Sequence, residues 1–96
     1  MAKPIIDWPS GQVRMRCAVV GLSIPGLSGT DIYPDLQIAA YACYLTARSV
    51  KRKMKLSEGR GLKRYCLKSL KNKGWCRVHL DRPEHYLTFT VRKEIG

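Results

Sequence analysis

Acidic side chains are scarce in this sequence of 96 residues, which has seven Asp and Glu against 18 Lys and Arg. No apolar run approaches the roughly 18 residues that a membrane-spanning helix needs. The motifs of nucleotide binding and catalysis that spacing can reveal are also missing: there is no phosphate loop, dinucleotide fingerprint or paired acid motif. We therefore expect a protein that has no membrane-spanning helix and is not an enzyme.

The N-terminus lacks a basic start followed by an apolar stretch, so we expect no secretory signal. The sequence has four cysteines, at Cys17, Cys43, Cys66 and Cys76. Because disulfides follow the redox compartment, we expect reduced thiols and an intracellular protein, in the cytoplasm or the nucleus.

Zinc sites usually begin with two cysteines spaced two to four residues apart, and this sequence has no such pair. Cys66, Cys76, His79 and His85 lie close together in the sequence. However, Cys76 and His79 are an odd number of residues apart in a predicted strand, so they should face opposite sides. We therefore expect no metal and no cofactor.

The length fits one domain, and the hydrophobic fraction of 45% is typical of a globular chain. Two prolines near the start, Pro4 and Pro9, predict an extended arm over residues 1–11. We expect residues 12–96 to form the single folded domain.

Alternation of apolar and polar residues predicts three strands, over residues 12–20, 75–80 and 85–93. Residues 81–84 have turn chemistry and should join the last two strands as a hairpin. Glycine, serine and proline predict a loop over residues 21–33.

Apolar spacings of three and four predict helices over residues 34–54 and 62–72. Pro34 suits the first helical position, Asp35 suits the first turn, and Gly74 suits the position just past the second helix. The expected fold class is α+β, with a small antiparallel sheet of about three strands packed against a two-helix layer in the order β-α-α-β-β. The second helix is expected to bury a stripe of four residues: Leu62, Tyr65, Cys66 and Leu70.

The excess positive charge is confined to residues 48–77, which hold twelve basic residues and one acidic residue, Glu58. Such a segment repels itself, and a polyanion relieves that repulsion and gains counterion-release free energy. We expect its cations to face solvent together and to bind a polyanion. They are Arg48, Lys51, Arg52, Lys53, Lys55, Arg60, Lys63, Arg64, Lys68, Lys71, Lys73 and Arg77.

Two shorter features are also candidates for binding. Gly59-Arg60-Gly61 precedes the second helix, whose free N–H groups suit a phosphate, or the glycines simply let the chain turn. In the loop, Leu22, Ile24 and Leu27 fit a membrane or partner contact, or they fold back over the core. We find no signature of base-specific reading, so nucleic acid would be bound by backbone or shape, largely without sequence specificity.

Several stretches resemble the core of rhabdovirus-type matrix proteins in order and in some residues. They are Val13-Arg14-Met15-Arg16, Tyr33-Pro34-Asp35-Leu36, and Gly59 to Tyr65 continuing into Cys66-Leu67-Lys68-Ser69-Leu70. Such proteins are usually longer and commonly carry a proline-rich motif, which this sequence lacks. The resemblance implies a structural virion protein that self-associates and attaches ribonucleoprotein to an anionic membrane.

Three functions follow from these features. The first is binding of RNA, DNA or ribonucleoprotein through residues 48–77. The second is a matrix-type role in the virion, bridging nucleocapsid and anionic membrane. The third is an adaptor for an acidic host protein.

Overall fold

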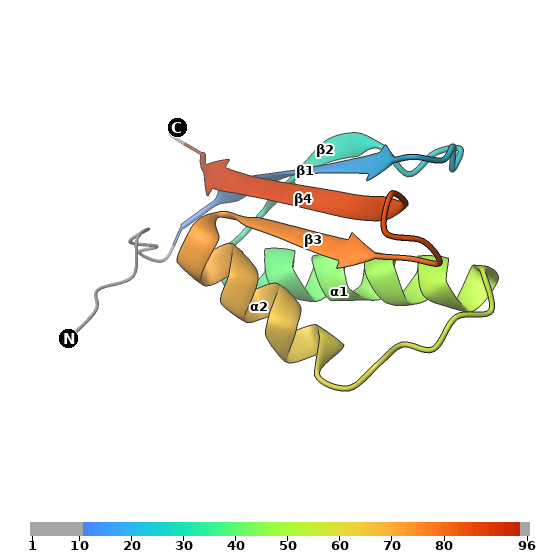
Figure 1. Cartoon of the computed structure of the whole chain (residues 1–96). Helices are drawn as coiled ribbons and strands as arrows, with labels where there is room; N and C mark the ends of the chain where they lie inside the picture. The colour runs from blue at the N-terminus through green and yellow to red at the C-terminus, as the bar shows by residue number, and fades with distance from the viewer. Residues whose placement is uncertain (1–10, 95–96) are drawn as a thin grey trace.

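A computed structural model of the chain describes residues 11–94, which form four strands and two helices (Figure 1). All strand pairs are antiparallel, and the strand order in the sheet is β2-β1-β4-β3. Apart from Gly11, the predicted N-terminal arm lies outside the described residues. The elements are β1 (Val13–Val20), β2 (Gly29–Tyr33), α1 (Leu36–Lys53), α2 (Leu62–Lys73), β3 (Trp75–His79) and β4 (Tyr86–Lys93).

The α+β class, both helices and the C-terminal hairpin are confirmed, but the prediction of three strands is wrong. The fourth strand is β2, which lies within the predicted loop and pairs with β1 at the edge of the sheet. Four of its five residues are exposed. A strand exposed on both faces does not need apolar alternation, and for this reason the sequence pattern did not reveal it.

Helix α1 begins two residues later than predicted because Asp35 is its N-cap. Asp35 has extended backbone angles, and its side chain accepts a hydrogen bond from the Ile38 N–H at 2.9 Å. The cap satisfies one of the free amides of the first turn, and Pro34 precedes it outside the helix. Gly74 follows the last residue of α2, as predicted, and has the left-handed conformation.

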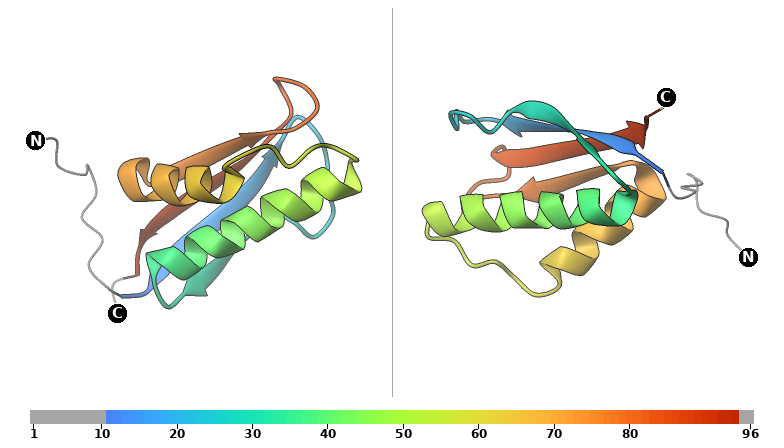
Figure 2. Two further views of the ribbon diagram at one scale, coloured as in Figure 1. Left: turned by 90° about the horizontal axis from the view of Figure 1, so that it is seen from below. Right: turned by 180° about the vertical axis from the view of Figure 1, so that it is seen from behind.

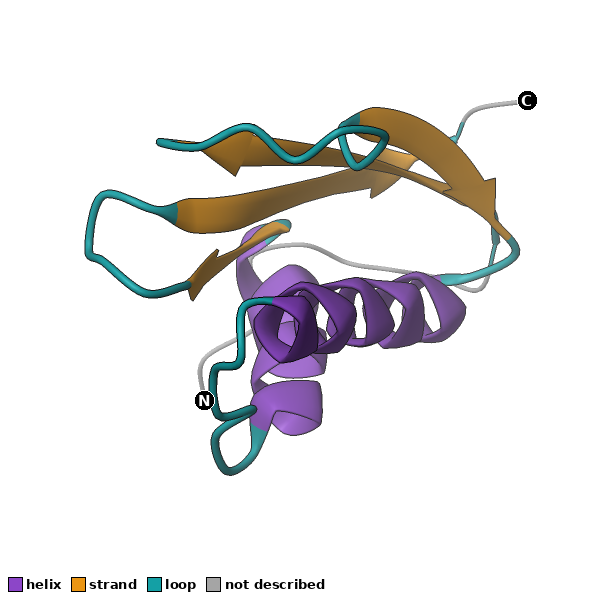
Figure 3. Cartoon of the chain, turned by 90° about the vertical axis from the view of Figure 1, so that its right-hand side faces the viewer, coloured by secondary structure: helices purple, strands orange, loops and turns teal. Residues whose placement is uncertain are grey.

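Both helices cover the same face of the sheet, and the core fills the space between the two layers (Figures 1 and 3). The inner face of α1 carries small residues, three of them alanines, which lets the helix lie close to the strands. The largest fully buried side chain is Phe89 of β4. Tyr65 was predicted to be buried, but it is 46% exposed because it reaches past the edge strand, where its hydroxyl donates to the Arg77 carbonyl.

The opposite face of the sheet is not covered by either helix or by any other described element (Figure 2). Alternation along each strand sends the second set of side chains to this outer face. These side chains are Thr30 and Ile32 of β2, Arg14, Arg16, Ala18 and Val20 of β1, Tyr86, Thr88, Thr90 and Arg92 of β4, and Trp75, Arg77 and His79 of β3.

Close packing between the end of β1 and the β3–β4 turn depends on Gly21. Its φ is +90°, and a Cβ at this position would lie 2.2 Å from the Glu84 carbonyl oxygen and 2.7 Å from the His85 ring. Gly26 also has a positive φ, of +76°, but a Cβ there would meet no atom within 4 Å.

We predict that Gly21→Ala destabilises the fold by clearly more than Gly26→Ala. Both changes place a side chain on a left-handed backbone, which costs about 1–2 kcal/mol, but only Gly21→Ala adds a clash with backbone. Urea unfolding of both variants measures the difference. Equal losses of stability would show that the contact at Gly21 is unimportant.

Candidate nucleic-acid interface

The outer face of the sheet is strongly basic. Arg14 of β1 is paired with Arg92 of β4, and Arg16 is paired with Thr90 one row further along. Arg77 projects from the edge strand β3 opposite Thr88. None of the outward side chains of the four described strands is acidic. Neighbouring strands are about 4.8 Å apart, so four guanidinium groups share one continuous surface.

Three of these arginines surround a hollow on the outer face. The hollow has a volume of about 430 Å³ and is lined by Arg14, Arg16, Thr30, Thr90 and Arg92. Guanidinium groups bind phosphate oxygens in a bidentate manner, and threonine hydroxyls add further donors. The chemistry of this hollow therefore suits a phosphate group.

One carboxylate beside the hollow orients Arg14. Glu94 follows β4 and accepts two hydrogen bonds from Arg14, at 2.9 Å from Nε and 2.8 Å from Nη2. These hydrogen bonds, together with the guanidinium charge, hold the pKa of Glu94 below its usual value. Arg14 is thus held in place at one side of the hollow, and Arg16 and Arg92 are exposed.

Two aromatic rings lie beside Arg77 on the same face. Trp75 is 42% exposed, with the Lys73 ammonium 5.0 Å and the Arg77 guanidinium 5.9 Å from its ring centre. Arg77 also lies 4.4 Å from the ring centre of Tyr86, whose other neighbour is His79. Aromatic rings and guanidinium planes are the groups on which unpaired bases stack.

The predicted cationic segment is divided between the two layers rather than gathered on one surface. Arg77 lies on the outer sheet face, whereas the other eleven residues belong to the helices and to their connection. Lys73 is the last residue of α2, and its ammonium group lies over the ring of Trp75. The expectation of one common surface is therefore wrong for Arg77. The physical reason is that the chain turns at Gly74 from the helix layer into the sheet.

Within the helix layer, the cations differ in their surroundings. Lys63 lies 5.1 Å from the centre of the Tyr41 ring, in a hollow between α1 and α2. Most of the remaining side chains are exposed along the end of α1, its connection to α2, and the outer side of α2. These are Arg52, Lys53, Lys55, Arg60, Arg64, Lys68 and Lys71. Arg48 and Lys51 are half-buried and contact Glu58.

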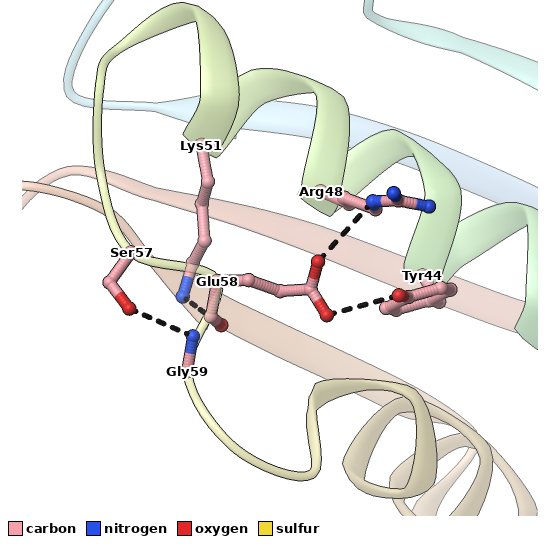
Figure 4. Close-up of polar contacts among 6 residues, drawn as sticks. All are labelled: Tyr44, Arg48, Lys51, Ser57, Glu58 and Gly59. Atoms are coloured by element: carbon pink, nitrogen blue, oxygen red, sulfur yellow. Dashed lines mark hydrogen bonds and ion pairs between the residues drawn. The ribbon is translucent and has the colours of Figure 1, made fainter.

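Glu58 ties the connection between the helices to α1 (Figure 4). One carboxylate oxygen lies 3.3 Å from Arg48 Nε, and the other accepts a hydrogen bond from Tyr44 at 3.0 Å. That hydrogen bond raises the pKa of Tyr44. Lys51 donates to the Glu58 carbonyl at 3.2 Å. Arg48 and Lys51 are therefore less available to a ligand than the exposed cations of α2.

The two shorter candidate binding features lie beside different helices. Gly59-Arg60-Gly61 precedes α2, and the loop with Leu22, Ile24 and Leu27 lies beside the C-terminal half of α1. Gly59 and Gly61 both have left-handed backbone angles, and Gly61 is the N-cap of α2 without a side-chain hydrogen bond. Phosphate binding at this position stays a prediction. Ile24 and Leu27 pack against the core, as expected if the loop folds back over it. Together with Leu22 they line a hollow of about 590 Å³ beside α1.

His79 and His85, the two histidines considered as zinc ligands, do not lie with the cysteines in one metal-binding group. Cys76 is buried and His79 is exposed, on opposite faces of β3, as the odd spacing predicts. His85 instead lies 2.9 Å from Asp81 within the β3–β4 turn. Within residues 11–94, no helix is long and apolar enough to cross a membrane.

Sequence reasoning missed Arg14, Arg16 and Arg92 as candidate binding residues because it searched for local concentrations of charge. Arg92 is far from Arg14 and Arg16 in the chain, and only the pairing of β1 with β4 brings it beside them. The alternation that placed them opposite the apolar residues was visible in the sequence and was the available signal.

We predict that Glu58→Gln lowers stability slightly, by at most about 1 kcal/mol, because it removes a partly exposed ion pair with Arg48. Urea unfolding at low and at high salt measures this loss, which should shrink as salt screens the pair. Glu84→Gln, at an exposed turn position, changes the net charge equally and serves as the control. A loss of the same size in the control would assign the effect to net charge.

Comparison of the chain with protein-family models, with curated proteins and with solved structures finds no match in any of the three.

Proposed function

We propose that this protein binds single-stranded nucleic acid across the outer face of its sheet. The observation that carries this proposal is the composition of that face. Arg14, Arg16, Arg77 and Arg92 share it with Trp75 and Tyr86, and none of the described strands contributes an acidic side chain to it. The net charge of +11 supports it, because a cationic protein attracts a polyanion over a long range. This attraction does not depend on the base sequence of the nucleic acid.

Two kinds of contact are assigned to different parts of the face. The hollow between Arg14, Arg16 and Arg92 suits backbone phosphates. Trp75 and Tyr86, with Arg77 between them, suit the faces of bases. A duplex hides the faces of its bases, so this combination favours a single strand.

The exposed cations of α2 contribute in a different way. They lie on the other side of the molecule from the outer sheet face, so one short strand cannot contact both sets (Figure 2). They raise the positive potential around the whole protein and hence the association rate. Their removal should weaken binding less than the removal of sheet arginines.

A second candidate function is attachment to an anionic membrane. The hollow lined by Leu22, Ile24 and Leu27 favours it, because Lys53 also lines this hollow and adds a positive charge to its apolar side chains. Flotation with vesicles containing phosphatidylserine tests this function. Equal flotation with neutral vesicles, or none with either, would count against it.

We predict that Arg16→Ala/Arg92→Ala weakens binding of a labelled oligouridylate about tenfold or more at low salt, since each arginine offers a charge-assisted hydrogen bond. The slope of log affinity against log salt should fall by about 1.4 if both contact phosphates of a single strand. Fluorescence anisotropy across a salt series measures both quantities.

The matched control is Arg64→Ala/Lys68→Ala, which removes the same charge from exposed positions on α2. If the control loses as much affinity as the sheet variant, the sheet face is not the interface. If the unaltered protein does not bind the oligouridylate at low salt, the nucleic-acid proposal itself is wrong.

We also predict that Trp75→Ala lowers affinity for the oligouridylate at least about fivefold, because loss of one stacked base costs about 1–3 kcal/mol. Tyr41→Ala is the control. Tyr41 is 48% exposed and also lies beneath a cation, but it belongs to the helix layer. Anisotropy and quenching of tryptophan fluorescence measure the effect, and equal losses in the two variants would contradict stacking on Trp75.

A further inference from the structure

Three of the four cysteines meet inside the core. The Sγ atoms of Cys43, Cys66 and Cys76 all lie within 4.8 Å of one another. Each of the three residues is 0% exposed. They come from three different elements, α1, α2 and β3, so the cluster lies where both helices meet the sheet. Cys17 does not belong to the cluster.

Cysteine often packs as a small apolar side chain, and one buried thiol needs no further explanation. Three neighbouring thiols differ from a single buried thiol, because their sulfur atoms together can supply all three ligands of a trigonal metal ion. We propose that Cys43, Cys66 and Cys76 form a closed trigonal site for a soft, thiophilic metal ion, best matched by monovalent copper.

The geometry fits such an ion. Metal–thiolate bonds are about 2.3 Å long, so a trigonal ion needs sulfur atoms about 4 Å apart. The observed upper limit of 4.8 Å requires only small rotations of the side chains to reach that separation.

The number of ligands selects the ion. Structural zinc sites are almost always four-coordinate, and within residues 11–94 no other Cys, His, Asp or Glu joins the group. A water ligand is also disfavoured because all three residues are fully buried. Thiolate ligands without nitrogen or oxygen select soft ions such as monovalent copper.

Binding of the ion requires no change of oxidation state. Each of the three S–H protons is replaced by a metal–sulfur bond and is released to water.

We expect the reduced full-length protein to bind one monovalent copper ion, measured anaerobically in competition with bicinchoninate. X-ray absorption should show three sulfur neighbours, and the thermal unfolding midpoint should rise because the ion binds only the folded state. Affinity should increase with pH, since protons are released. Cys66→Ala should abolish binding, whereas Cys17→Ala should leave it unchanged.

Several outcomes would overturn the site. They are no binding by the unaltered protein, fewer than three sulfur neighbours, or equal loss in the Cys17→Ala control. Tight binding of zinc with none of copper would overturn the choice of ion. Because the absorption spectrum of the unaltered protein reports the ligands directly, the test stands even if Cys66→Ala fails to fold, and circular dichroism identifies that case.

Discussion

The pairing of β1 with β4 joins the first described strand to the last over eight residue pairs, from Val13 with Lys93 to Val20 with Tyr86. This ladder forms the centre of the sheet and separates its two faces. One set of alternating side chains meets the helices and the other faces outward. A slip of one residue would exchange the two sets and place arginines in the core, so burial of Met15, Phe89 and Val91 fixes the register.

The same register gives the molecule its distribution of charge. A chain with a net charge of +11 repels itself, and the fold relieves this by placing cations around both layers. Carboxylates are used locally: Glu58 holds the connection between the helices, and Glu94 orients Arg14. What is left exposed is a basic, aromatic sheet face and a basic helix, and both suit a polyanion better than a neutral ligand.

The small residues on the inner face of α1 allow the close packing that brings the three cysteines of the cluster together. Ala39, Ala40 and Ala47 are at most 3% exposed, and their size lets the helix approach the strands closely. Cys43 lies between these alanines in the sequence and can therefore reach Cys66 and Cys76. A larger residue at any of these positions would push α1 outward and separate the three sulfur atoms.

The sequence by itself determined the α+β class, both helices, the C-terminal hairpin and the apolar stripe of α1, because these depend on local periodicity and on turn residues such as Gly74. It did not determine β2, whose exposed residues carry no alternation, or the exposure of Tyr65, which depends on the neighbouring strand edge. Only the tertiary structure placed Arg92 beside Arg14 and Arg16 and brought three distant cysteines together. Spacing along a chain describes neighbours within an element, whereas both candidate sites are assembled from elements that meet only through long-range strand pairing and helix packing.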